Sequence, residues 1–474
     1  MVSLLVRMLV VVSRTGLRIV FERVAVVETM EKNSMLGFLK TTSAPISIDF
    51  GYSAVKVLQV QTGNEYQVVG AAIAEIPASI RQSPSERANY LLETLPGLIH
   101  KGGFKGKVAV CSIPAWQTYI QHLQVEKTDT AGIREQVKSQ LQMSIACDPD
   151  CAVIRYVEVG DVFRDGGVMR EVIAFAVSRD VVMSQVELLK KCKLEAGGLH
   201  AEPIAVLQAY HHLYRRGGDE RTTTLYVDIG NHGTKAMIAH GRDLKFAKSI
   251  PVGGRHFDEE IARALHCEVE AAHDHRMYEA HLCSPAHDSA EASMSSGTAA
   301  LGSNGQSVVA KGAMLSVAAT ASAVGRESRF GGRISRKPSK ADRRKGSIPG
   351  EFHPVADHGV SSDVACGEAG ESLVRKAMTE IVSQLVEELR MSVRYHRAIF
   401  PNRRIDRMIL NGGECRDSEM CLQVASSLGV RSFVGDPLKR LRVVSGSRLQ
   451  GIHDLRQRPG WAVPIGLCLA PVDD

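Results

Sequence analysis

The sequence predicts an α/β fold in which two related halves share one ligand. Three observations predict it. An apolar strand, a turn with glycine and a second apolar strand occur at 46–60, and the same pattern returns at 222–240. A third strand, 405–410, runs into Asn411-Gly412-Gly413-Glu414. Because a strand followed by a glycine turn can bring backbone amides close to a phosphate, the repetition indicates a ligand held from both sides.

The first half, 45–220, alternates strands and helices. Strand segments are continuously apolar or alternate in polarity, whereas helical segments repeat their apolar residues every three to four positions. These patterns predict strands at 46–50, 54–60, 66–76, 107–113, 152–159 and 171–177, and helices at 84–100, 130–145 and 181–196. Gly197 and Gly198 are the expected stop of the last helix.

The second half begins after a polar stretch at 215–221 and is expected in two parts, 221–282 and 369–474. Its patterns predict strands at 222–230, 234–240 and 405–410, and helices at 257–266, from 371 onward and up to 428. An apolar, glycine-containing segment at 462–469 closes the chain. The helix from 371 is long and apolar on one face, so it is expected to cover a sheet.

A segment of different composition, 283–368, separates those two parts. Ser, Ala, Gly and charged residues dominate it, aromatic residues are few, and no period is sustained. Such a segment cannot bury enough apolar surface to offset its chain entropy, so the sequence predicts a disordered insertion.

The basic character of the chain is local. Its net charge is +6, and the tract 326–345 alone has nine Lys and Arg residues against Glu327 and Asp342. The tract could contact phosphates of a nucleic acid, which is one alternative function, but it offers only Phe330 for base stacking. A solvated loop explains it more simply, and nucleic acid is not the expected partner.

The N-terminal segment 1–44 is expected to be an extension. Arg7, Arg14, Arg18 and Arg23 interrupt its apolar residues, so no run reaches the roughly 18 residues of a membrane span. An upstream start codon, with translation beginning at Met30 or Met35, is the simplest explanation. The ten cysteines have no regular spacing, which indicates buried thiols in a reducing compartment and no structural zinc.

Two hairpins carry the residues expected to bind phosphate. In the first, Asp49 ends a strand, where its carboxylate can hold the water ligands of Mg²⁺. Gly51 allows backbone amides to approach phosphate oxygens, and Ser53 and Lys56 add a hydroxyl and a cation. The second hairpin repeats this chemistry with Asp228, Gly230, Gly233 and Thr234, and the pair Gly412 and Gly413 offers a flat surface for adenine or ribose.

The order of these motifs resembles the actin, sugar kinase and heat-shock ATPase superfamily, and within it the PilM family of type IV pilus assembly proteins. The resemblance covers 45–474 apart from the insertion. It rests on five features: IDFGYSAVK at 48–56, Val-Gly-Gly at 252–254, LVEELRMSVRYH at 385–396, ILNGGE at 409–414, and PIGLCLA at 464–470. The segment 77–200 resembles the extra subdomain that this family shares with the cell-division protein FtsA.

The resemblance implies an actin-like (ribonuclease H-like) two-domain ATPase fold that binds Mg-ATP. Asp49, Gly51, Ser53 and Lys56 would form the first phosphate loop, and Asp228, Gly230, Gly233 and Thr234 the second. Asp49 and Asp228 would hold the magnesium through water, Gly253 and Gly254 would lie near the nucleotide, and Gly412 and Gly413 at the adenosine. No carboxylate is a clear general base, so at most a weak Mg-dependent ATPase is expected.

The resemblance also implies a location and a partner. The chain would be a cytoplasmic scaffold, held at the inner membrane by the pilus assembly complex. Its partner would be the short N-terminal cytoplasmic segment of a PilN-like membrane protein, bound to the first domain under the control of the nucleotide. Whether the machine makes pili, takes up DNA or secretes protein stays open, as does self-association.

Two departures from the family pattern bear on the ligand. The helix that faces adenosine in the family carries an Ala-Glu-x-x-Lys-like pattern, whereas here the matching stretch is Ala272-His273-Asp274-His275-Arg276. His232, in the second hairpin, is unusual and is expected to face solvent. A sugar-type kinase of the same superfamily is an alternative, although 77–200 has no motif for its catalytic Asp, and a scaffold that binds no nucleotide is another.

Overall fold

The computed structural model describes residues 45–282 and 372–470, apart from short gaps at 62–64, 146, 165, 212–217, 440 and 453–457. It also describes four short strands near the N-terminus: β1 (Leu4–Val6), β2 (Leu9–Ser13), β3 (Gly16–Val20) and β4 (Arg23–Ala25). The predicted insertion, with its basic tract, lies outside the described residues.

A six-stranded sheet forms the first half, in the order β12-β8-β5-β6-β7-β18. Three consecutive strands are antiparallel, and β8 and β12 then run parallel to β5 and to each other. The strands are β5 (Ile46–Phe50), β6 (Ala54–Gln61), β7 (Gln67–Glu75), β8 (Val108–Ile113), β12 (Glu195–Ala201) and β18 (Arg442–Leu449).

A five-stranded sheet, in the order β15-β14-β13-β16-β17, forms the second half. Its strands are β13 (Thr223–Ile229), β14 (Thr234–His240), β15 (Asp243–Ile250), β16 (Arg407–Asn411) and β17 (Ser432–Val434). Here too, three antiparallel strands are followed by two parallel ones. The order matches that of β7-β6-β5-β8-β12, so the repeated hairpin in the sequence belongs to a repeated sheet.

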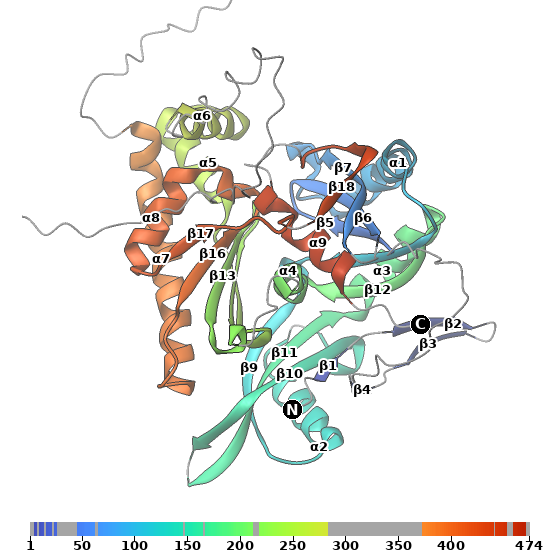
Figure 1. The fold of residues 1–474 in the computed structure, drawn as a ribbon, viewed down its shortest axis with the longest axis vertical. Helices are drawn as coiled ribbons and strands as arrows, with labels where there is room; N and C mark the ends of the chain where they lie inside the picture. The colour runs from blue at the N-terminus through green and yellow to red at the C-terminus, as the bar shows by residue number, and fades with distance from the viewer. Residues whose placement is uncertain are drawn as a thin grey trace, which may run out of the picture. The chain divides into compact units, whose positions relative to one another are not determined.

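The described part of the chain contains nine helices (Figure 1). They are α1 (Pro84–Gly102), α2 (Thr130–Leu141), α3 (Arg179–Lys191), α4 (Glu202–His211), α5 (Gly254–Leu265), α6 (Val269–Leu282), α7 (Leu373–Ile399), α8 (Ser418–Leu428) and α9 (Ala462–Leu469). The helix α9 packs on β5, β6 and β8, and α4 packs on β14. The helices α4 and α9 also pack tightly on each other, since Gly466 faces the backbone of Ala205, and so they join the cores of the two halves.

A separate three-stranded antiparallel sheet lies within the first half, in the order β10-β11-β9. It consists of β9 (Tyr119–Glu126), β10 (Ala152–Arg164) and β11 (Gly167–Ser178). One face packs against α2 around Val125, Val137 and Val172. The strands β8 and β12, which also fall within 77–200, belong to the large first sheet, and the predicted domain limits stay a prediction.

Three hydrogen bonds attach this small sheet to the second half. Tyr395 of α7 donates to the buried carboxylate of Glu171 at 2.6 Å. The amide of Ala247 on β15 donates to His122 Nε2 at 3.3 Å, and Lys245 donates to the carbonyl of Val159 at 2.9 Å. The small sheet therefore contacts both halves of the molecule.

The end of α3 corrects one prediction. The helix ends at Lys191 rather than at 196, because Lys193 has a left-handed backbone (φ 62°) that no helix continues. Gly197 and Gly198 lie inside β12, where the pairing with β8 is irregular between Ala196 and Gly198. The glycine pair therefore marks a bulge, not a helix stop. The sequence patterns did not predict β9, β12, β15, β17, β18, α4 or α6.

A pair of histidines sits between β14 and α7. His240 and His396 share a 2.8 Å hydrogen bond between their Nε2 atoms. Burial, aided by the nearby positive charge of Arg403, lowers the pKa of His240 to about 3 and that of His396 to about 4. Both rings are therefore neutral in the folded protein at pH 7.

This pair predicts acid sensitivity. In the unfolded chain histidine titrates near pH 6.5, so as the pH falls below that value the unfolded state binds protons first. The contribution to the free energy of unfolding is complete above about pH 6.5 and is lost down to about pH 4. Thermal unfolding measured between pH 8 and pH 4 should show this slope. His240→Gln should flatten it, whereas replacing the exposed His100 by Gln should not; equal slopes in all three proteins would contradict the assignment.

Candidate functional site

The first hairpin, β5 and β6, places Asp49 opposite Lys56 in antiparallel register. Asp49 is buried, and its Oδ1 accepts a 2.9 Å hydrogen bond from the hydroxyl of Ser112 at the end of β8. Burial raises the pKa of Asp49, although Lys56 opposes this effect. Lys56 Nζ donates a 2.6 Å hydrogen bond to the carbonyl of Gly460. The hairpin is thus tied to the neighbouring strand and to a C-terminal turn.

Arg87 of α1 orients the turn of this hairpin. Its guanidinium donates to the carbonyls of Phe50, Gly51 and Tyr52, with 2.7 Å to the last. In a trans peptide the carbonyl and the following N–H point in opposite directions. The amides of Gly51, Tyr52 and Ser53 therefore point away from Arg87, and they are available to an anion on that side of the turn.

The second hairpin, β13 and β14, repeats the pairing with Asp228 opposite Lys235. Lys235 Nζ lies 2.6 Å from Asp228 and 3.1 Å from Glu202, at the start of α4. Burial lowers the pKa of Lys235, but Asp228 and Glu202 more than offset this and hold it above its usual value. Glu202 also accepts a hydrogen bond from the amide of Ala115, and burial raises its pKa.

Thr234 and Gly253 connect this hairpin to α5. The Thr234 hydroxyl is fully buried and donates to the carbonyl of Val252 at 2.7 Å, so its proton is used within the fold instead of facing a ligand. Gly253 lies against the turn, where a Cβ would fall 2.6 Å from the amide of Gly233. The amide of Gly254 donates to the carbonyl of Gly230 at 3.0 Å. These contacts place the N-terminus of α5 on the second hairpin.

The two glycines after β16 differ in their surroundings. Gly412 has φ +98°, and a Cβ there would overlap the backbone of Ile229, including its nitrogen at 2.7 Å. A Cβ on Gly413 would meet nothing within 4 Å. The flat surface expected from both glycines is therefore limited to Gly413, because Gly412 is packed into the second sheet.

These elements of the two halves lie together. The charge of Asp49 is influenced by Lys56, Asp228 and Lys235, which come from both hairpins. Gly460, whose carbonyl accepts the hydrogen bond from Lys56, lies beside Gly413. A Cβ at position 460 would fall 3.5 Å from the amide nitrogen of Gly413. Residues widely separated in sequence thus form one polar cluster.

A family comparison covers the part of the chain that contains both hairpins. Residues 47–282 match the family described as type IV pilus assembly protein PilM. The chain is a PilM-like protein. A comparison with curated proteins found no match.

One solved structure supports the fold of this PilM-like chain, and two others show a weaker similarity. The structure titled "PilM-PilN type IV pilus biogenesis complex" has a TM-score of 0.61 and 16% identity, over 90% of this chain and 98% of that chain. EutJ from Carboxydothermus hydrogenoformans has a TM-score of 0.40 and 11% identity, over 91% of this chain and 90% of that chain. MreB 5 of Spiroplasma citri, bound to AMPPNP, has a TM-score of 0.37 and 12% identity, over 90% of this chain and 95% of that chain. The prediction of an actin-like α/β fold is confirmed.

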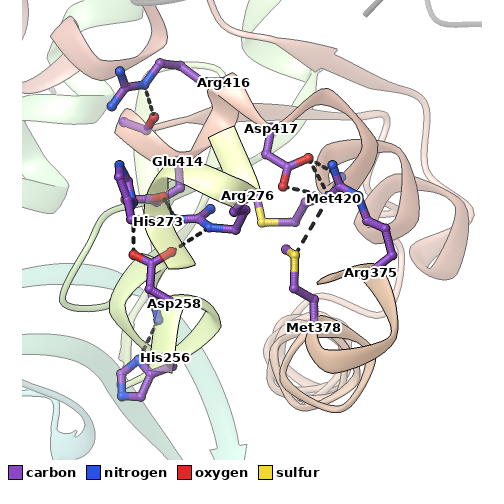
Figure 2. Close-up of polar contacts among 12 residues, drawn as sticks. His256, Asp258, His273, Arg276, Arg375, Met378, Glu414, Arg416, Asp417 and Met420 are labelled. Carbon is purple, nitrogen blue, oxygen red and sulfur yellow. Dashed lines mark hydrogen bonds and ion pairs between the residues drawn. The ribbon is translucent and has the colours of Figure 1, made fainter. Parts of the chain in front are cut away.

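Arg276 lies in the stretch that matches the adenosine-facing helix of the PilM family, but its side chain is not free to contact a ligand. It is fully buried, with Nε 2.8 Å from Asp258 on α5 and Nη2 2.7 Å from Glu414 after Gly413 (Figure 2). His273 also contacts Asp258, at 3.0 Å. Burial opposes the charge of Arg276, but Glu414 and Asp258 raise its pKa above the usual value. Arg276 therefore holds the Gly412-Gly413-Glu414 turn against α5 and α6.

A second buried arginine anchors the other side of this turn. Arg375 at the start of α7 contacts both carboxylate oxygens of Asp417, at 2.8 and 3.0 Å (Figure 2). Asp417 also caps α8 by accepting from the amide of Met420 at 3.1 Å. The turn that carries Gly413 is therefore fixed between two buried ion pairs.

His232 is another correction. It was expected to face solvent, yet it is half-buried, with ring centroids 4.6 Å from Tyr52 and 5.3 Å from Trp116. Trp116 lies 5.5 Å from Tyr52 in an edge-to-face contact. These aromatic contacts join the tips of the two hairpins, because apolar ring area outweighs the polarity of a neutral imidazole.

The cluster suits a nucleotide with bound Mg²⁺ only if water molecules lie between the metal and the carboxylates. In the part of the chain that the structure describes, no group of three or more His, Cys, Asp or Glu side chains could hold a metal. Mg²⁺ usually keeps several waters and binds phosphate oxygens, so one carboxylate from each hairpin, Asp49 and Asp228, suffices. Buried atoms without a hydrogen-bond partner among the described residues, Asn231 Oδ1, His232 Nδ1 and Arg255 Nε, also fit a bound polar group at the second hairpin.

Four residues of the cluster were not among the predicted site residues: Arg87, Ser112, Glu202 and Lys235. Lys235 could have been found, since the position seven residues after Asp228 faces it across a short hairpin. The other three come from distant elements, and no local pattern marks them.

Proposed function

We propose that this PilM-like chain is an ATP-binding scaffold for assembly of a type IV pilus or a related secretion or competence machine. The observation that carries the proposal is the pair of equivalent hairpins, one from each half, with Asp49 and Asp228 in a single buried cluster. The match of residues 47–282 to the PilM family supports the biological setting.

In this proposal Mg-ATP binds between the hairpins. The amides of Gly51 to Ser53 and the turn at Gly230 to Gly233 contact the phosphates, Lys56 adds positive charge, and the open surface at Gly413 receives the adenosine. Bound magnesium would neutralise phosphate charge beside Asp49 and Asp228. A ligand that contacts both hairpins favours the conformation in which they are close, and that preference is the basis of a switch.

The proposed partner is the N-terminal cytoplasmic segment of a PilN-like inner-membrane protein. A structure of similar fold is titled as a PilM-PilN complex, which supports this choice. No helix in the described residues is long and apolar enough to cross a bilayer. Attachment to the inner membrane is proposed to occur through the PilN-like partner.

Calorimetric titration with Mg-ATP tests the proposal on the whole chain. The double variant Asp49→Asn, Asp228→Asn keeps side-chain volume and removes both charges, and it is expected to raise the dissociation constant at least about tenfold. Asp161→Ala, which removes an exposed acid paired with Lys127, is the matched control and should bind as the wild type does.

Each outcome separates the candidate functions. Wild-type binding that is lost only in the double variant, whose circular dichroism is unchanged, supports the nucleotide site. No binding in the wild type, together with capture of the PilN-like segment, supports a scaffold that uses no nucleotide. ADP formation that depends on an added sugar supports the kinase alternative.

A further inference from the structure

The tip of the second hairpin gathers cationic groups beyond the two predicted phosphate loops. The ring of His232 packs at a tilt against Tyr52 and Trp116, with Arg87 placed over both of those rings. Burial lowers the pKa of His232, and Arg255 and His256 of α5 and Lys235 of β14 lower it further. Lys235 is neutralised by Asp228 and Glu202.

Arg255 is half-buried. Within residues 45–282 and 372–470, outside the short gaps, it has no carboxylate partner, whereas the buried Lys235, Arg276 and Arg375 each have at least two. Its backbone amide donates to the carbonyl of Asn231 at 2.9 Å, so the two residues are held together. Its guanidinium, whose Nη2 lies 3.4 Å from His256 Nε2, follows Gly254 at the positive end of α5.

Three buried polar atoms at this tip lack hydrogen-bond partners in the described part of the protein. They are Asn231 Oδ1, His232 Nδ1 and Arg255 Nε. Asn231 is only 9% exposed, and the assignment of its amide oxygen and nitrogen can be exchanged to present a donor. A buried unpaired polar group costs about 1–3 kcal/mol, so three in one place favour binding of a polar group that can pair with them.

We propose that Asn231, His232 and Arg255 form an anion site that receives the terminal phosphate of a nucleoside triphosphate. The inference rests on the proposed function for the position of that phosphate. It adds side-chain recognition to the backbone contacts of the hairpin, and it gives the site a means to distinguish triphosphate from diphosphate. Arg255 supplies a charge-assisted hydrogen bond, and His232 supplies a second, charged donor once its ring is protonated.

Proton uptake follows from the position of His232. Burial, with the positive charges of Arg255, His256 and Lys235, lowers its pKa to about 4, so the free ring is neutral at pH 7. A terminal phosphate bears up to two negative charges and favours the imidazolium. Binding of triphosphate should therefore take up a proton, and affinity should rise as the pH falls towards the pKa of the bound ring.

Calorimetry in buffers of different ionisation enthalpy measures this uptake. Wild-type protein is expected to take up more protons with Mg-ATP than with Mg-ADP, and His232→Asn should abolish the difference. Arg255→Gln should weaken Mg-ATP at least about tenfold and Mg-ADP little, because a charge-assisted hydrogen bond is lost only with the triphosphate. His100→Asn, on the exposed surface of α1, is the matched control.

Two results would overturn the inference. One is nucleotide binding with equal proton uptake for ATP and ADP. The other is equal loss of both affinities in the two variants. If the wild type binds neither nucleotide, the proposed function fails, and magnesium tripolyphosphate then tests the anion site by itself. An NMR shift of the His232 ring that is absent in Arg255→Gln supports the site, and unmoved resonances reject it.

Discussion

Replacing Arg276 by Met is expected to lower the free energy of unfolding by about 3–5 kcal/mol, the usual effect of removing one partner from a buried ion pair. Arg276 is fully buried and lies between two carboxylates, Asp258 and Glu414. Without it both carboxylates stay buried, and Glu414 also lies against Gly254, whose Cβ would fall 2.6 Å from Glu414 Oε2.

Urea unfolding followed by circular dichroism measures this loss. Arg263→Met is the matched control on α5, because its ion pair with Glu260 is exposed and should contribute no more than about 1 kcal/mol. Combining Arg276→Met with Glu414→Gln should recover part of the stability, since one unpaired charge is removed. Similar losses in Arg276→Met and Arg263→Met would show that the buried network does not hold the turn.

Gly412→Ala and Gly413→Ala should differ sharply in the free energy of unfolding, although the two residues are adjacent. A methyl group at 412 must adopt φ +98° and overlap the backbone of Ile229, so a loss of roughly 2–5 kcal/mol is expected from strain and overpacking together. At 413 the methyl group has open space, so stability should be unchanged. Soluble yield and thermal unfolding of the two variants give the comparison.

The same pair tests the adenosine position. If Gly413 is the surface that receives the adenosine, its methyl group should weaken Mg-ATP binding while the protein stays folded. A Gly413→Ala protein that binds as the wild type does would move the adenosine elsewhere. A Gly412→Ala protein of normal stability would contradict the close packing against Ile229.

The parts of the fold that were predictable are those with a local signal. The hairpins at 46–60 and 222–240, α1, α7 and the glycine turn after β16 each follow from apolar spacing or turn residues. The strand β12 was missed because its glycines resemble a helix stop, and only pairing with β8 makes them a strand. Tertiary pairing overrode the local preference there.

In the candidate site, too, only the residues with a local signal were predictable. Asp49 and Asp228 could be found because each ends an apolar strand in a repeated pattern. The partners that decide their charge could not, since Ser112 and Glu202 come from other elements. His232 was misplaced because its stacking partners, Tyr52 and Trp116, are distant in sequence. The ion pair of Arg276 could not be predicted either, as Glu414 lies 138 positions away.

The contact between the small sheet and the second half restricts how the molecule can move. Tyr395 to Glu171, Ala247 to His122 and Lys245 to Val159 join these parts over one surface. A rotation of the halves that preserves these bonds must pivot there, and displacement then grows with distance from the pivot. Residues near Glu171 would then be displaced little, and surfaces remote from it would be displaced more.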